Sequence, residues 1–249
     1  LSVAIAGSHA LDSAFVVFRG FDTYIKKAAD LGFDGVELAL KNVDEIDPCI
    51  LSSLLKETGM EVSCISTGQV FADTGLMFTD PDPGKRNRVT GVFRKMIDLA
   101  SGFGGMVNIG RIRGFLDSND REGKALDRFH EVMQVLCDYA LEKNVTLVLE
   151  PINRYETNFI NNVEEGVEVL KRIGRPNLKL MPDLFHMNIE DRDAGEVLAE
   201  HINYIAYLHF ADSNRLAPGR GHIDFGGIFN ALKRVNYNGW CSLEILPFP

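Results

Sequence analysis

Short apolar runs alternate along the chain with longer stretches in which apolar positions recur every three or four residues. The short runs predict strands buried on both faces, and the longer stretches predict amphipathic helices. Strands are expected at residues 2–6, within 31–40, and at 61–66, 106–110, 147–150, 178–183, 205–210 and 241–246. Eight strands and seven helices in alternation predict a parallel sheet.

One connection is unusually long. Residues 67–84, TGQVFADTGLMFTDPDPG, separate the third strand from the next helical stripe. Loops of that length in compact domains are usually functional. We expect a lid or a binding loop here.

The chain has 249 residues, close to the length typical of a TIM barrel. No linker or composition shift divides it, so we predict an α/β fold in which residues 1–249 form a single (β/α)8 TIM-barrel domain. A doubly wound open sheet is the alternative. The sequence stops before any eighth helix, which therefore is missing from the chain, and we expect the native gene product to continue past Pro249.

Four successive predicted strands carry a polar residue at or near their end. Glu150 and Asp183 close their strands, His209 precedes the last residue of its strand, and Glu244 lies within CSLEIL. Because the carboxyl ends of barrel strands meet at one face, we expect the four side chains to converge. Hard oxygen ligands plus one imidazole suit one divalent metal ion, namely Mn²⁺, Mg²⁺ or Co²⁺.

Side chains alternate along a strand, so these four polar groups also predict what lies beneath them. If they point into the barrel, residues two positions earlier form the layer below, namely Val148, Met181, Tyr207 and Ser242. Lys179 would enter the bottom of the barrel by the same rule and must extend its amine outward.

Three further polar residues follow the same strands. Glu156, His186 and Arg215 lie on three consecutive loops just beyond the strand ends. Each alone would be an ordinary solvated or hydrogen-bonded group. Their shared position around the predicted metal site favours a functional role for all three.

The composition argues against two classes of function, nucleic-acid binding and membrane insertion. The net charge of −9, without a basic cluster, opposes nucleic-acid binding, and no apolar run approaches the length of a membrane span. The four cysteines are far apart and form no CxxC motif, which is typical of reduced thiols in a cytoplasmic protein.

Four segments resemble signatures of one known group of enzymes. LEPINRYET, DLFHMNIED, LHFADSNRLAPGRGHIDF and SLEILPFP are similar to motifs of the ketose 3-epimerases, the D-tagatose 3-epimerase group of the xylose-isomerase-like superfamily. STGQ at 66–69 and IGRIRG at 109–114 resemble the branch that acts on keto sugar acids, such as 5-keto-L-gluconate epimerase. One departure is Leu184, where the family usually has Thr.

The resemblance implies specific roles. Glu150, Asp183, His209 and Glu244 would bind the metal, and Glu150 and Glu244 would also exchange protons with the substrate. Glu156, His186 and Arg215 would hold oxygens near the reacting carbon. Arg113, in the segment GRIRG, is expected to reach the barrel mouth and bind a carboxylate, which makes a keto sugar acid the expected better substrate.

The chemistry also follows from the residue types. A divalent ion stabilises the enediolate that forms when a proton leaves the carbon next to a ketone, and two carboxylates can move that proton between faces. We therefore predict a metal-dependent epimerase, an isomerase of carbohydrate metabolism acting on a ketose or keto sugar acid.

Several alternatives remain open. They are an aldose-ketose isomerase, a non-catalytic sugar-binding protein, and a phosphorylated substrate bound at PGRG, residues 218–221. A zinc endonuclease is disfavoured because the chain has only six scattered histidines. Whether the chain forms a homo-oligomer is also open.

Overall fold

One parallel sheet closes into a barrel at the centre of the computed structural model, which describes residues 1–11, 14–117 and 123–246. Its strands run in the spatial order β7-β6-β5-β4-β3-β1-β9-β8, and bridges from Leu180 to Ile205 and from Asp183 to His209 join β7 to the β8 side. The strands are β1 (Ser2–Ala6), β3 (Gly35–Ala39), β4 (Glu61–Ser66), β5 (Met106–Ile109), β6 (Thr146–Leu149), β7 (Leu178–Leu180), β8 (Tyr207–Phe210) and β9 (Trp240–Leu243). The short β2 (Phe18–Arg19) pairs with β1 only.

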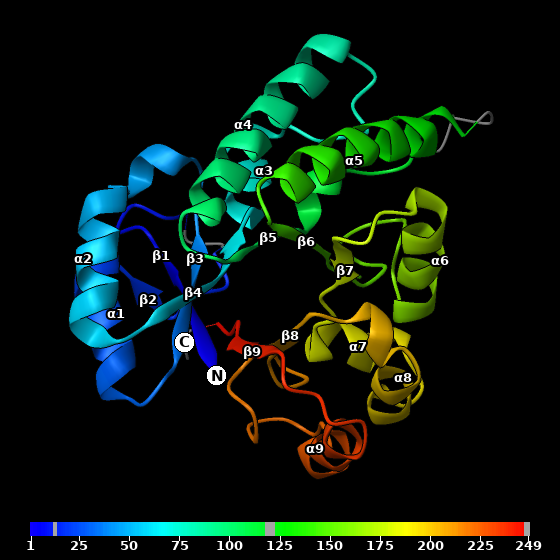
Figure 1. Cartoon of the computed structure of the whole chain (residues 1–249). Helices are drawn as coiled ribbons and strands as arrows, with labels where there is room; N and C mark the ends of the chain where they lie inside the picture. The colour runs from blue at the N-terminus through cyan, green and yellow to red at the C-terminus, as the bar shows by residue number, and fades with distance from the viewer. Residues whose placement is uncertain (12–13, 118–122, 247–249) are drawn as a thin grey trace.

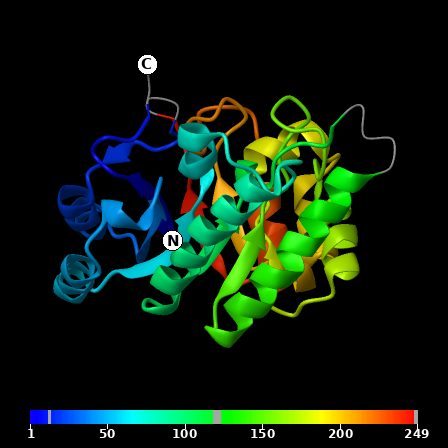
Figure 2. The ribbon, with the colours of Figure 1, turned by 90° about the horizontal axis from the view of Figure 1, so that it is seen from above.

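Helices surround the strands, as Figure 1 shows along the barrel and Figure 2 from a second direction. The α-helices are α1 (Phe21–Asp30), α2 (Pro48–Thr58), α3 (Gly68–Thr74), α4 (Pro83–Ser101), α5 (Lys124–Glu142), α6 (Val163–Ile173), α7 (Leu184–Glu190), α8 (Ala194–Glu200) and α9 (Phe225–Arg234). Three short 3-10 helices are η1 (Val43–Glu45), η2 (Arg111–Arg113) and η3 (Ile202–Tyr204). The predicted (β/α)8 barrel is confirmed.

Local sequence signals explain where several helices begin. Asp47 and Asp82 accept hydrogen bonds from main-chain N–H groups at the starts of α2 and α4, and each is followed by a proline in the first turn. Asn162 caps α6, which also has acids in its first turn and bases in its last, as the helix dipole favours.

The barrel interior is packed as the alternation rule predicts. Cys64, Val148, Met181 and Tyr207 form a buried cluster, and Ser242 is fully buried as well. Lys179 extends its amine outward and donates to the carbonyl of Asn203 at 3.0 Å. The polar groups near the C-terminal ends of these strands lie above this packed layer. They therefore face the C-terminal end of the barrel.

The predicted single loop over residues 67–84 is wrong. Its first part is α3, and α4 already begins at Pro83. Val70 is fully buried and Phe71 packs against Phe115 with ring centroids 5.9 Å apart, so the short helix has its own apolar contacts. Helix α3 thereby fills the space beside η2. Within the described part of the chain, no helix is long and apolar enough to cross a membrane.

Candidate active site

Glu150, Asp183, His209 and Glu244 converge at the C-terminal ends of four adjacent strands. One ligand atom from each lies within 4.8 Å of the other three. The Nδ1 atom of His209 is 3.3 Å from Glu150 Oε1, 3.5 Å from Glu244 Oε2 and 4.0 Å from Asp183 Oδ2. The structure therefore brings the four predicted residues together in one cluster.

The cluster has the spacing that a divalent ion requires. Around an octahedral ion with ligands at about 2.2 Å, neighbouring ligand atoms are about 3.1 Å apart and opposite ones about 4.4 Å. The separations from His209 Nδ1 are 3.3–4.0 Å, close to that range. Three carboxylates and one imidazole could therefore hold one metal ion.

Glu150 follows β6 directly and is held from two sides. Its Oε2 accepts a hydrogen bond from Asn108 Nδ2 at 3.2 Å, and its main-chain carbonyl accepts one from Arg113 Nη1 at 2.5 Å. Burial raises the pKa of Glu150, but the hydrogen bond and charge of His209 outweigh burial and lower that pKa to about 2. Glu150 is therefore a carboxylate.

Glu244 differs from Glu150 in its electrostatics. Burial raises the pKa of Glu244, and the positive charges of His209 and Arg215 only partly oppose this effect. Its Oε2 accepts a short hydrogen bond from Arg215 Nη2. Two carboxylates that share one site thus hold protons with different affinity.

Arg215 lies against the same cluster. Its guanidinium donates to Asp183 as well as to Glu244, and its Cζ lies 4.6 and 4.8 Å from the ring centroids of Phe15 and Phe185. The residue has a φ of 64°, in the left-handed region. Its loop is fixed by Asp212, which accepts main-chain hydrogen bonds from Ser213, Gly219 and Ile223.

His186 faces the cluster from α7 and is linked to Glu156 through Asn153. Asn153 Oδ1 accepts from the Tyr155 N–H at 3.0 Å, so its Nδ2 must point to Glu156 Oε1 and to His186 Nδ1, at 3.1 and 2.7 Å. His186 Nδ1 is then the acceptor, and Nε2 carries the proton. That Nε2 lies 4.0 Å from Glu150 Oε1. Burial lowers the pKa of His186, which favours this neutral form.

His209 differs from His186 in which ring nitrogen faces the cluster. His209 Nε2 lies 2.8 Å from Oε2 of Glu37, a fully buried residue of β3, and its Nδ1 faces the acids. Burial lowers the pKa of His209, but the carboxylates of Glu37, Glu244 and Glu150 raise it well above its ordinary value. A metal at Nδ1 would therefore replace a proton.

Arg113 lies behind the site instead of at its mouth. It is fully buried, donates to the Glu150 carbonyl and stacks over Phe159 at 5.6 Å. Arg111 is half-buried and stacks over Phe71 at 5.2 Å. The contact expected between Arg113 and a substrate carboxylate therefore has no support from this placement.

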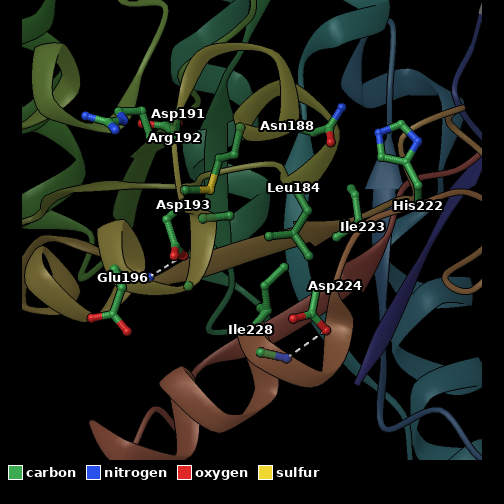
Figure 3. A pocket seen from close by; sticks show the side chains of 14 residues that line it. Leu184, Asn188, Asp191, Arg192, Asp193, Glu196, His222, Ile223, Asp224 and Ile228 are labelled. Atoms are coloured by element: carbon green, nitrogen blue, oxygen red, sulfur yellow. Dashed lines mark hydrogen bonds between the residues drawn. The ribbon is translucent and has the colours of Figure 1, made fainter.

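Leu184 is also turned away from the cluster. With Ile223 and Ile228 it lines a pocket of about 360 Å³ between α7, α8 and α9 (Figure 3). None of the four candidate ligands is among the described residues that line this pocket. The side chain of Leu184 thus faces this pocket between helices.

Sequence reasoning did not single out three polar residues next to the cluster, namely Glu37, Asn108 and Asn153. Glu37 and Asn108 lie inside the apolar strands GVELA and MVNI. A polar side chain at an inward-facing position of such a strand is a usable signal, because it must find a buried partner.

Comparison with known proteins agrees with this geometry. Residues 25–247 match the family described as xylose isomerase-like TIM barrel. The chain is 33% identical over 222 residues to an L-ribulose 3-epimerase of Methylomonas sp. (strain DH-1), covering 88% of this chain and 76% of that protein. It is 29% identical to a D-psicose 3-epimerase of Agrobacterium fabrum, covering 90% of this chain and 78% of the relative.

A solved structure shows the same fold. The D-allulose 3-epimerase from Methylomonas sp. in complex with D-allulose superposes with a TM-score of 0.80 at 27% identity, covering 98% of this chain and 84% of that one. Most of these relatives are ketose 3-epimerases and one is a 3-dehydro-D-guloside 4-epimerase, and the Glu, Asp and His cluster fits a metal-dependent epimerase. The chain belongs to the xylose isomerase-like TIM barrel family, in agreement with the D-tagatose 3-epimerase group.

Proposed function

We propose that this protein inverts the carbon next to the ketone of a free ketose, at C3, with Glu150 and Glu244 as the proton-transferring groups. The observation that carries the proposal is the position of these two carboxylates in one four-residue cluster. A sugar-binding protein would need the rim contacts but not two carboxylates at one centre.

We further propose that Glu150, Asp183, His209 and Glu244 hold one hard divalent ion, for which Mn²⁺ is the first candidate. Oxygen-rich donor sets with one imidazole suit Mn²⁺, Mg²⁺ and Co²⁺. When bound, the ion would supply Lewis-acid stabilisation of negative charge on the substrate oxygens. All other steps belong to the side chains of the chain itself.

The proton transfers follow from the two carboxylates. Glu150 is ionised and can remove the proton bound to C3 from one face of the sugar. Glu244, which lies in the same cluster, can exchange a proton with the other face. The reverse reaction uses the same groups in exchanged roles. The net result is the opposite configuration at C3 without change elsewhere.

The rim residues would orient the sugar. His186 presents an N–H donor toward Glu150, and Glu156 is fixed beside it through Asn153. Arg215 offers its guanidinium to the substrate oxygens beside Asp183 and Glu244. Donors on one side and carboxylates on the other match the hydroxyl and carbonyl groups of a ketose.

We propose a neutral ketose in preference to a keto sugar acid. The guanidinium expected to bind a carboxylate, that of Arg113, is fully buried on the Glu150 carbonyl. The relatives named above act on L-ribulose and D-psicose, which are uncharged ketoses. A keto sugar acid is the second candidate, and D-psicose and L-ribulose are the substrates to test first.

The test is to incubate the Mn²⁺-loaded protein with each ketose and with a 5-keto sugar acid in D₂O. We expect the C3 epimer of a neutral ketose to form and to carry deuterium at C3. Formation of an aldose would instead establish an aldose-ketose isomerase. Sugar binding without any deuterium uptake would establish a non-catalytic binding protein. Faster turnover of the acid than of the ketoses would make a keto sugar acid the preferred substrate.

A further inference from the structure

We infer that Glu37 is a positioning residue that holds His209 as a metal ligand through Nδ1 and strengthens metal binding at the cluster. The inference rests on the metal-dependent function proposed above. It concerns β3, on the other side of the barrel from the strands that carry the candidate ligands.

The hydrogen bond between Glu37 and His209 fixes which ring nitrogen is free. Glu37 Oε2 lies 2.8 Å from His209 Nε2, and both side chains are fully buried. The same Oε2 also accepts from the Tyr207 hydroxyl, so it acts as an acceptor and Nε2 carries the proton. The lone pair of the neutral ring is then on Nδ1. That is the nitrogen 3.3 Å from Glu150 Oε1 and 3.5 Å from Glu244 Oε2.

A second interaction holds Glu37 in place. The Tyr207 hydroxyl donates to the same Oε2 at 3.0 Å, and it contacts the hydroxyls of Ser63 and Ser2 at 2.8 and 3.1 Å. These groups come from β1, β4 and β8, so the carboxylate is anchored across the barrel floor. A ligand histidine oriented by a fixed carboxylate loses less freedom when it binds a metal.

The negative charge of Glu37 should also strengthen metal binding, in addition to its effect on the orientation of His209. Glu37 places one more carboxylate directly behind a cluster that already contains Glu150, Asp183 and Glu244. Among the described residues, Arg215 is the guanidinium that pairs with these acids. The additional negative charge favours a divalent cation in a setting where water is excluded. Removing it should weaken metal binding even if the ring stays in place.

Two substitutions separate orientation from charge. Glu37→Gln keeps an oxygen that can accept from His209 Nε2 but removes the charge, so we expect Mn²⁺ to bind about three- to tenfold more weakly. Glu37→Leu removes both and should weaken Mn²⁺ about ten- to a hundredfold, the usual effect of losing an outer partner of a ligand. The readout is the dissociation constant of Mn²⁺ for the metal-free protein, measured by titration calorimetry.

Two controls make the result specific. Tyr207→Phe removes the second partner of Glu37 but leaves its bond to His209, so its Mn²⁺ affinity should fall less than that of Glu37→Leu. Glu57→Gln neutralises an exposed carboxylate paired with Lys26 and should leave Mn²⁺ affinity unchanged. A Tyr207→Phe loss as large as that of Glu37→Leu would assign the effect to packing of the barrel floor and overturn the inference.

A direct readout is the His209 Nε2 proton in Mg²⁺-loaded, ¹⁵N-histidine-labelled protein. We expect a downfield, hydrogen-bonded resonance that is lost in Glu37→Leu. Unchanged Mn²⁺ affinity in Glu37→Gln would overturn the inference even if Glu37→Leu does not fold. If the unsubstituted protein binds Mn²⁺ but does not epimerise ketoses, the proposed reaction fails while these measurements still decide the role of Glu37.

Discussion

The two halves of the barrel contribute different things to the site. Glu150, Asp183 and Glu244 follow β6, β7 and β9, and His209 lies within β8. The loops and the helix after these strands carry Glu156, His186 and Arg215. The described parts of β1, β3, β4 and β5 supply none of the ligands. They supply the groups that hold them, namely Glu37 for His209 and Asn108 for Glu150.

This difference separates chemistry from positioning. A substitution of a candidate ligand in the ligating half, β6 to β9, removes a group that would bind the metal or move a proton. A substitution in the supporting half, β1 to β5, leaves every such group present but less well oriented. The first kind should abolish the reaction, and the second should reduce it by a graded amount.

The largest effect is expected from the two carboxylates of the ligating half. Glu150→Gln and Glu244→Gln each remove one proton-transferring group while keeping the shape of the side chain. We expect epimerisation to fall by at least about 10²- to 10⁴-fold in each variant. Deuterium exchange from solvent should differ between them, since one variant can still exchange the C3 hydrogen of one epimer only.

The control is Glu57→Gln, an equal change at an exposed carboxylate, which should retain full activity. Circular dichroism should show an unchanged fold in all three variants. Full epimerase activity in either site variant would exclude a mechanism with two carboxylates.

A smaller effect is expected from Asn108 in the supporting half. Asn108→Leu has a similar volume but cannot donate to Glu150 Oε2, a bond of 3.2 Å. Hydrogen bonds to charged groups contribute about 1.5–3 kcal/mol, so kcat should fall about ten- to a hundredfold. Steady-state kinetics at saturating Mn²⁺ measure this. A loss equal to that of Glu150→Gln would contradict the division between ligating and supporting halves.

The sequence predicted that the four candidate ligands would converge, as they do, but it did not single out the groups that hold them. Each candidate ligand stands next to an apolar run, so its place at a strand end could be deduced from the alternation of strands and helices. Arg113 shows what could not be predicted from the sequence. Its place after β5 was predictable, but whether its guanidinium turns toward the mouth or under Glu150 depends on the three-residue η2, which has no periodic signal.

The same limit applies to other residues. Glu37 contacts His209, 172 residues away, and Asn153 links nearby Glu156 to His186, 33 residues away, so neither role could be deduced from local sequence. Helix α3 was hidden in a segment whose glycines and aspartates suggested a loop, because its stability comes from tertiary contacts of Val70 and Phe71.

Arg113 provides a test that combines position and substrate. Arg113→Met removes the donor to the Glu150 carbonyl while filling most of the same space. Because the side chain lies behind Glu150, we expect kcat/KM to fall by about tenfold, the lower end for a charged hydrogen bond, and equally for neutral and acidic sugars. The measurement is kcat/KM on D-psicose and on a 5-keto sugar acid. A loss confined to the acid would place Arg113 in contact with the substrate.

The smallest effect concerns a loop of the ligating half that is held by its own backbone. Asp212 is buried, and burial raises its pKa, but hydrogen bonds from the main chain of Gly221, Ser213, Ile223 and Gly219 lower that pKa to about 2. A pKa below the unfolded value of about 3.9 means that the folded state favours the carboxylate. The resulting stabilisation is fully present above about pH 4 and is lost as the pH falls toward 2.

Asp212→Asn should therefore lower the free energy of unfolding by about 2 kcal/mol at pH 7, because one amide nitrogen replaces an oxygen that accepts from Gly219. Urea denaturation at pH 7, 5 and 3 measures the difference between the two proteins. The difference should stay constant from pH 7 to 5. It should shrink at pH 3, because Asp212 of the unsubstituted protein then begins to bind a proton and loses its charge. A difference that is the same at all three pH values would show that the carboxylate charge does not hold this loop.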